Sequence, residues 1–174
     1  EILSTYQYLV RITLNRLKRC ERLPPLGLLP SLIILNIYEM NAVREVGSEF
    51  YGDTGTFHSL QELTFWNMPN LERWSTEATL PGIEMFPCLT YLTVKGCPNL
   101  TPEPCLPPSV LELKMHYSNA GILLASNLTR QRSSSLKKLE IYQCKSSSSP
   151  GWDGLKHLTF LEDLTIVNCE ELVS

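Results

Sequence analysis

The sequence contains no apolar run long enough to cross a membrane. The longest candidate, residues 26–35, is interrupted by Pro30 and is shorter than the roughly 18 residues that a spanning helix needs. No secretory leader is visible, but the chain begins with Glu1 and ends just after a complete strand motif. We therefore expect a piece of a longer protein, and the missing leader does not identify the compartment.

Charged side chains are few and are not concentrated in one place. The chain has 15 basic and 18 acidic residues, a net charge of −3, and its one basic cluster is Arg16, Lys18, Arg19 and Arg22. Scattered basic residues do not form a surface that follows a phosphate backbone. We therefore expect no nucleic-acid partner.

The combinations of residues that catalysis or metal binding requires are also missing. None of the three histidines has a cysteine or carboxylate at metal-ligand spacing. The glycines form neither a phosphate loop nor a dinucleotide fingerprint. No nucleophile, base and oxyanion-binding group can be assembled, so we expect no enzymatic activity and no metal or cofactor in this chain.

What the sequence does contain is one short motif that occurs seven times, with leucine-type residues at its positions 1, 4 and 6. Successive motifs start 21 to 29 residues apart, which is the spacing of leucine-rich repeats. We predict an α/β repeat solenoid, a leucine-rich repeat horseshoe with a parallel concave β-sheet and a convex side made mostly of loops and short helices. Residues 1–174 would form a single domain whose repeats start near Leu9, Leu32, Leu60, Leu89, Val110, Leu136 and Leu161.

The third residue after the last apolar position of each motif forms a second column, where this repeat class prefers Asn or Cys. We expect a small side chain there to point inward and meet the backbone of the following loop, and a larger one to be held by packing alone. The column is Leu17, Met40, Met68, Cys97, Ser118, Cys144 and Cys169. Three inward cysteines favour reduced, buried thiols and therefore a cytoplasmic protein, which in its intact form could also be nuclear or membrane-associated. The other cysteines, Cys20, Cys88 and Cys105, fall in or beside loops.

Prolines restrict the connections between the motifs to turns and single-turn helices. The connection Asn119–Ser135 lacks proline and is the best helix candidate, whereas the polar segment Lys145–Gly151 predicts a mobile loop. Neither end carries a polar capping repeat, so we expect the terminal coils to expose core residues.

Alternate residues of each strand point away from the core and form columns across the sheet. The column directly after position 6 contains four rings among its seven members, at Tyr38, Trp66, His116 and Tyr142. Such rings can stack across neighbouring strands, and they can also form a strip that binds a partner. The two roles are compatible. No metal-ligand partner accompanies His116, so we interpret it as a contact residue. The candidate partner-binding residues are Arg16, Tyr38, Trp66, Lys95, Lys114, His116, Tyr117 and Tyr142.

Four segments of the connections go beyond the generic repeat: Leu23–Ile37 (LPPLGLLPSLIILNI), Val46–Gly52 (VGSEFYG), Met68–Trp74 (MPNLERW) and Phe86–Leu100 (FPCLTYLTVKGCPNL). In this order they resemble the C-terminal leucine-rich repeat region of plant immune receptors of the coiled-coil, nucleotide-binding (NLR) type. The resemblance covers residues 9–174 and is strongest over 23–100. Leu28 departs from it, because the family often has a polar residue there, and the fifth repeat is degenerate at Val110 and Ser118.

The resemblance implies a sensor arm of a receptor in plant defence. Such an arm helps to hold the receptor inactive and recognises a pathogen or pest effector, directly or through a guarded host protein. Its partners would be that protein and the upstream domains of the same receptor. ADP or ATP would bind an upstream domain that is absent here, and no nucleotide site is expected in this chain.

Two other readings of a repeat domain remain open. One is the substrate-recognition domain of a ubiquitin ligase, which an upstream F-box-like segment would favour. The other is an extracellular receptor domain with glycans at Asn99 and Asn127, although the Gly-x-Ile-Pro connections typical of such domains are not found.

Overall fold

A computed structural model describes residues 5–52, 56–75, 84–100, 107–119, 135–143, 155 and 158–169. Several expectations fall outside this range, namely the helix after Asn119, the loop Lys145–Gly151, the thiols Cys105 and Cys144, and the sequon at Asn127. The strands of the repeat motif are all described.

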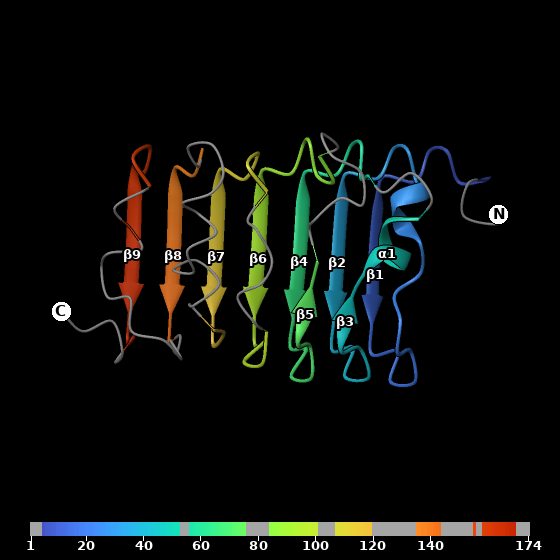
Figure 1. Ribbon diagram of the computed structural model, residues 1–174, viewed down its shortest axis with the longest axis horizontal. Helices are drawn as coiled ribbons and strands as arrows, with labels where there is room; N and C mark the ends of the chain where they lie inside the picture. Colours follow the sequence, from blue (N-terminus) through green and yellow to red (C-terminus); the bar gives the residue numbers. More distant parts are fainter. Residues whose placement is uncertain are drawn as a thin grey trace.

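The fold is a parallel-sheet solenoid in which each repeat motif supplies one strand (Figure 1). Each strand starts at the third position of its motif, and neighbouring strands pair in sequence order without any shift of register. Residues at the same motif position therefore lie side by side, as the columns predicted. The strands are β1 (Arg11–Asn15), β2 (Ile34–Tyr38), β4 (Glu62–Trp66), β6 (Tyr91–Lys95), β7 (Glu112–His116), β8 (Lys138–Tyr142) and β9 (Asp163–Val167).

Apolar side chains at motif positions 1, 4 and 6 form the core of the inner coils. In the second coil, Leu35 and Ile37 are completely buried. At the two ends of the array no further coil covers these positions in the described chain, and Leu164 is 43% exposed. The expectation that the terminal coils expose core residues is met.

The inward column after each strand behaves as predicted in the coils where a small residue occupies it. The Cys97 thiol, the Ser118 hydroxyl and the Cys169 thiol each donate to the carbonyl two residues earlier, at 3.6, 2.9 and 3.5 Å. Met40 and Met68 are fully buried and are held by packing. The prediction was wrong for Leu17, which is 46% exposed because it belongs to the outermost described coil.

One feature of the strand exits was not predicted from the sequence. The residue after each of the seven strands has a positive φ, between 49° at Tyr117 and 67° at Gly96. This left-handed turn lets the backbone leave the sheet, and the N–H of the turning residue donates to the next strand, as from Arg16 to the Tyr38 carbonyl at 3.1 Å. Left-handed backbone disfavours most residues other than Gly and Asn. The same turn nevertheless follows all seven strands, so the residues directly after the strands form a column of their own at the strand exits.

The connections on the other side of the sheet carry short elements in place of long helices. These are the 3-10 helix η2 (Leu26–Leu28), strand β3 (Glu45–Val46), helix α1 (Ser48–Tyr51) and strand β5 (Arg73–Trp74), with β3 and β5 pairing in parallel. The single-turn helices agree with the prediction from the prolines. Leu28, the departure from the family pattern, is half buried over Gly52, where a Cβ would lie 2.7 Å from its Cγ.

A cluster of aromatic rings fills the space between these connections and the sheet. Phe57 stacks on Phe86 with ring centroids 5.3 Å apart, and Tyr51 meets the edges of both rings at 5.9 and 5.6 Å. Trp74 packs against Phe65 of the sheet at 5.2 Å. The segments that carry the family resemblance are therefore parts of the hydrophobic core.

Candidate partner-binding surface

The candidate surface is the exposed sheet face, which we define as motif positions 3, 5 and 7 of the seven strands. Burial alternates along each inner strand, so that these positions are accessible while positions 4 and 6 are buried. This alternation follows from the pleat of a β-strand, which points successive side chains to opposite faces.

Three predicted residues at position 7 form a continuous contact across β2, β4 and β6. The rings of Tyr38 and Trp66 meet edge to face, with centroids 5.4 Å apart. The Lys95 Nζ lies 4.9 Å from the Trp66 ring centroid, within the range of a cation–π interaction. Trp66 remains 46% exposed, so its stacking with Tyr38 does not remove it from the surface.

The same column continues with a second ring pair on β7 and β8. His116 and Tyr142 lie 4.4 Å apart between ring centroids, with an interplanar angle of 31°. Partial burial holds the pKa of His116 below its ordinary value, Lys95 and Lys114 lower it further, and Glu140 acts in the opposite direction. The imidazole is therefore favoured in its neutral form, and Lys95 is the cation of this column.

An ion-pair network at positions 3 and 5 of β7, β8 and β9 holds Lys114. Glu140 accepts from Lys114 Nζ at 3.3 Å and from Lys138 Nζ at 3.2 Å, and Lys138 also reaches Asp163 at 3.1 Å. Lys114 is thus already paired within the sheet.

The two remaining predicted residues lie on the left-handed turns at the strand exits, next to the exposed sheet face. Arg16 forms a two-point ion pair with Glu39 of the next coil, through Nε at 2.8 Å and Nη2 at 3.1 Å. Tyr117 is 55% exposed and follows His116. The structure therefore places all eight predicted residues along one side of the solenoid, although Arg16 and Lys114 are engaged by carboxylates.

The sequence argument overlooked the column at position 3. Tyr91 is 48% exposed and lies between Glu62 on β4 and Glu112 on β7. The period-two pattern could have found this column, because Tyr91 is two residues before Thr93 in the same strand.

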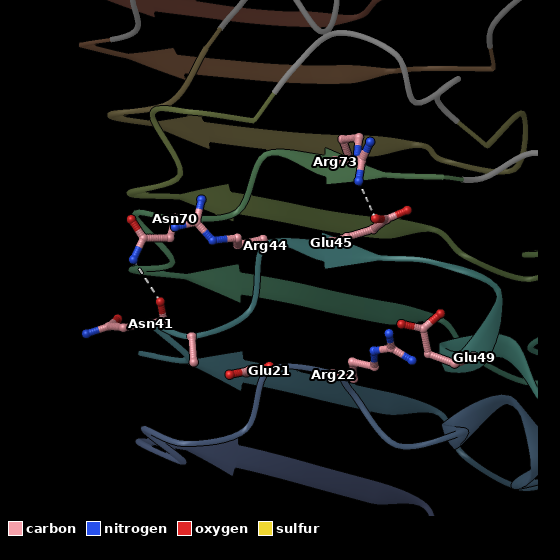
Figure 2. A pocket seen from close by; sticks show the side chains of 9 residues that line it. Glu21, Arg22, Asn41, Arg44, Glu45, Glu49, Asn70 and Arg73 are labelled. Atoms are coloured by element: carbon pink, nitrogen blue, oxygen red, sulfur yellow. Dashed lines mark hydrogen bonds and ion pairs between the residues drawn. The ribbon is translucent and has the colours of Figure 1, made fainter.

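A separate hollow of about 690 Å³ lies on the connections that follow β1, β2 and β4 (Figure 2). Its charges are balanced, and three of them are already paired, since Arg73 donates to Glu45 at 2.6 Å and Arg44 donates to Glu72 at 2.7 Å. Asn70 also donates to the Asn41 carbonyl there at 2.8 Å. The charged lining consists of Glu21, Arg22, Arg44, Glu45, Glu49 and Arg73.

Within the residues that the structure describes, no three His, Cys, Asp or Glu side chains are grouped as metal ligands. The four described cysteines are free thiols, and Cys97 is buried. Among the described helices, none has the length and apolar character that crossing a bilayer requires.

Curated proteins of related sequence match along nearly the whole chain. The chain is 30% identical over 180 residues to "Putative disease resistance RPP13-like protein 1" of Arabidopsis thaliana, a match that covers 98% of the chain and 17% of the relative. The chain is a relative of plant disease resistance proteins.

Two further relatives have names of the same kind. "Disease resistance protein RGA2" of Solanum bulbocastanum is 27% identical over 97% of the chain and 15% of its own length. "Putative disease resistance protein At3g14460" of Arabidopsis thaliana is 37% identical over 56% of the chain and 7% of its own length. The chain thus spans less than a fifth of each relative. No family model matches the chain, and no solved structure matches it significantly.

These relatives bear out the resemblance to the leucine-rich repeat region of NLR-type resistance proteins. The match to the RPP13-like protein extends over nearly the whole chain, so it includes the exposed sheet face as well as the connections.

Proposed function

We propose that this chain is the ligand-sensing arm of an intracellular plant immune receptor and that it also helps to hold the receptor inactive. Its ligand would be a pathogen or pest effector, or a host protein that the effector modifies. The observation that carries the proposal is the match to a disease resistance protein along 98% of the chain.

The exposed sheet face supports a protein as the ligand. Trp66, Tyr91 and Tyr117 present large rings at 46, 48 and 55% exposure on or beside a flat surface. Aromatic side chains supply much contact area for little loss of rotamer entropy and are enriched among residues that dominate binding energy. Because each repeat contacts only its neighbours, such surface residues can change without refolding the core.

We assign no catalysis, metal or nucleotide to this chain. ATP or ADP exchange belongs, in this proposal, to an upstream domain of the intact receptor. Activation then requires that the ligand binds the active receptor more tightly than the inactive one. The chain would contribute the ligand-binding surface, and the upstream domains would contribute the change between the two states.

The test is a cell-death assay in leaf tissue with the full receptor that contains this chain. The variant Trp66→Ala/Tyr142→Ala should lose the response to the cognate pathogen at unchanged protein abundance, while removal of the chain should give a response without pathogen. His58→Ala, an exposed loop change away from the sheet face, is the matched control. An unchanged pathogen response in both the double variant and the deletion would contradict the proposal.

A further inference from the structure

The middle of the exposed sheet face has opposite charges at its two ends. On β4, β6 and β7, position 3 carries Glu62, Tyr91 and Glu112 in adjacent register, and position 7 carries Trp66, Lys95 and His116. The amino-terminal end of this patch is acidic around a tyrosine, whereas the carboxyl-terminal end is cationic beside a tryptophan.

The acidic end suits a cation of a partner. Tyr91 is 48% exposed, and its neighbours Glu62 and Glu112 form no ion pair with any described residue. A guanidinium or ammonium over the Tyr91 ring would form a cation–π contact with the ring face and ion pairs with the two flanking carboxylates. Neighbouring strands lie about 4.8 Å apart, which is within reach of both glutamate side chains.

The cationic end suits a carboxylate. Lys95 contacts the Trp66 ring and forms no ion pair with a described residue, in contrast to Lys114 and Lys138, which bind Glu140. The residue that follows it, Gly96, has no side chain, so nothing projects from that turn to cover the lysine.

The neighbours of Lys95 leave this lysine as the cation of the carboxyl-terminal end. Lys114 on the adjacent strand β7 pairs with Glu140 on β8, and His116 beside Lys95 is held mostly neutral near pH 7. Among the described residues at this end, Lys95 is therefore the unpaired charge, and the rings of Trp66 and His116 lie on the strands on either side of it.

We propose that β4, β6 and β7 bind a protein segment that places a cation over Tyr91 and a carboxylate on Lys95. Positions 3 and 7 of a strand are about 13 Å apart, at roughly 3.3 Å per residue. A helix of the partner spans most of this distance between residues i and i+7, about 10.5 Å at 1.5 Å per residue, and long side chains span the rest. Small Thr93 lies between the two ends and leaves room for apolar side chains of the partner.

This inference rests on the proposed function, since it names the chemistry of the protein that the exposed sheet face recognises. It predicts a direction of docking as well as a surface, because the acidic and cationic ends are not interchangeable. A partner of a single sign of charge would satisfy only one end and would face repulsion at the other.

The test uses three alanine-based helical peptides and the 174-residue chain in fluorescence anisotropy. The dipolar peptide carries Arg and Glu seven residues apart with leucines between them, and the other two carry Glu or Arg at both positions. We expect the dipolar peptide to bind about tenfold more tightly than either single-sign peptide.

Charge reversals then identify the two ends. Lys95→Glu should shift the preference to the Arg peptide, and Glu62→Lys/Glu112→Lys should shift it to the Glu peptide. Lys18→Glu, an exposed lysine outside the face, is the matched control, and thermal melts confirm that each variant is folded.

Several results overturn the proposal. Equal affinity for the three peptides, or binding of none of them, would do so. A preference of the unmodified chain for the Glu peptide would indicate a general anion site. Preferences that the charge reversals leave unchanged would also contradict the proposal. If the peptides fail but Trp66→Ala/Tyr142→Ala still abolishes the pathogen response, the polarity is wrong and the proposed function stands. If the pathogen response is unchanged in both the double variant and the deletion, both the polarity and the proposed function are wrong.

Discussion

Gly27 packs directly against the backbone of Tyr51, so closely that a Cβ on Gly27 would lie 2.1 Å from the Tyr51 carbonyl oxygen. The contact joins η2 to α1, and it therefore joins the Leu-Pro-Pro-Leu-Gly segment to the Val-Gly-Ser-Glu-Phe-Tyr-Gly segment. Two motifs that were only a family likeness in the sequence form one packed unit in the fold.

The substitution Gly27→Ala should therefore destabilise the chain by about 1–3 kcal/mol, the usual cost of overpacking, because the obstructing atoms are backbone and cannot rotate away. Urea unfolding measures the change. Gly47→Ala is the matched control, since the nearest atoms to its Cβ are the carboxylate oxygens of Glu49 and Glu45 at 3.0 and 3.5 Å, which can move. Equal losses in the two variants would show that the Gly27 contact does not require glycine.

Tyr51→Phe should also destabilise the chain. The buried Tyr51 hydroxyl accepts from Trp74 Nε1 at 3.0 Å and donates to the Ser75 carbonyl, and burial raises the pKa of this phenol. Removing the hydroxyl leaves both partners unpaired, at a cost of about 1–3 kcal/mol. Denaturant unfolding of Tyr91→Phe, on the exposed sheet face, should give almost no change, and a Tyr51→Phe effect as small as this would refute the argument.

Truncation of the position-7 rings separates binding from stability. Trp66→Ala and Tyr142→Ala should each weaken partner binding by about 2 kcal/mol, as for central interface residues, and lower stability by no more than about 1.5 kcal/mol from lost ring contacts. Binding by titration calorimetry and melting by circular dichroism measure the two effects. A large loss of stability with unchanged binding would mean that the rings serve only cross-strand packing.

His116 makes stability depend on pH. Because its pKa in the folded chain lies below the ordinary value of about 6.5, the unfolded chain binds more protons than the folded chain near that pH. The stabilisation from neutral His116 is complete above pH 6.5 and is lost as the pH falls through the lowered value. The difference in unfolding free energy between pH 7 and pH 5 should therefore be smaller in His116→Gln. The same pH dependence in both proteins would exclude this role.

Cys97 should resist alkylation. Burial raises the pKa of its thiol to about 11, so very little thiolate is present at pH 8. Peptide mapping after brief iodoacetamide treatment should find Cys88, which is exposed, modified well before Cys97. Modification of both at one rate in the folded chain would contradict the buried position, and urea should remove the difference.

Much of the fold could be predicted from the sequence because the repeat motif couples two periodicities. Alternation within a strand decides which side chains face inward, and the repeat spacing places one strand in each coil. The columns with Leu35 and with Trp66 follow from these rules and appear in register in the structure. The same rules would have found Tyr91 had they been applied to position 3.

Other features could not be predicted because they depend on atoms brought together across coils. The left-handed turn at Tyr117 could not be predicted, because no glycine occupies that position in the sequence. The exposure of Leu17 depends on whether a neighbouring coil covers it. The aromatic cluster around Phe86 joins two connections, the one between β2 and β4 and the one between β4 and β6, and the places where its rings occur follow no period in the sequence.

The sequence by itself determined the solenoid, the direction of each strand residue and the likeness to resistance proteins, because these depend on local pattern and on motifs. Only the tertiary structure decided which charges are available on the exposed sheet face. Lys95 and Lys114 both point outward from neighbouring strands, at positions 7 and 5, yet Glu140 pairs with Lys114 and the Trp66 ring contacts Lys95. That difference arises from which side chains the parallel register places on the neighbouring strands.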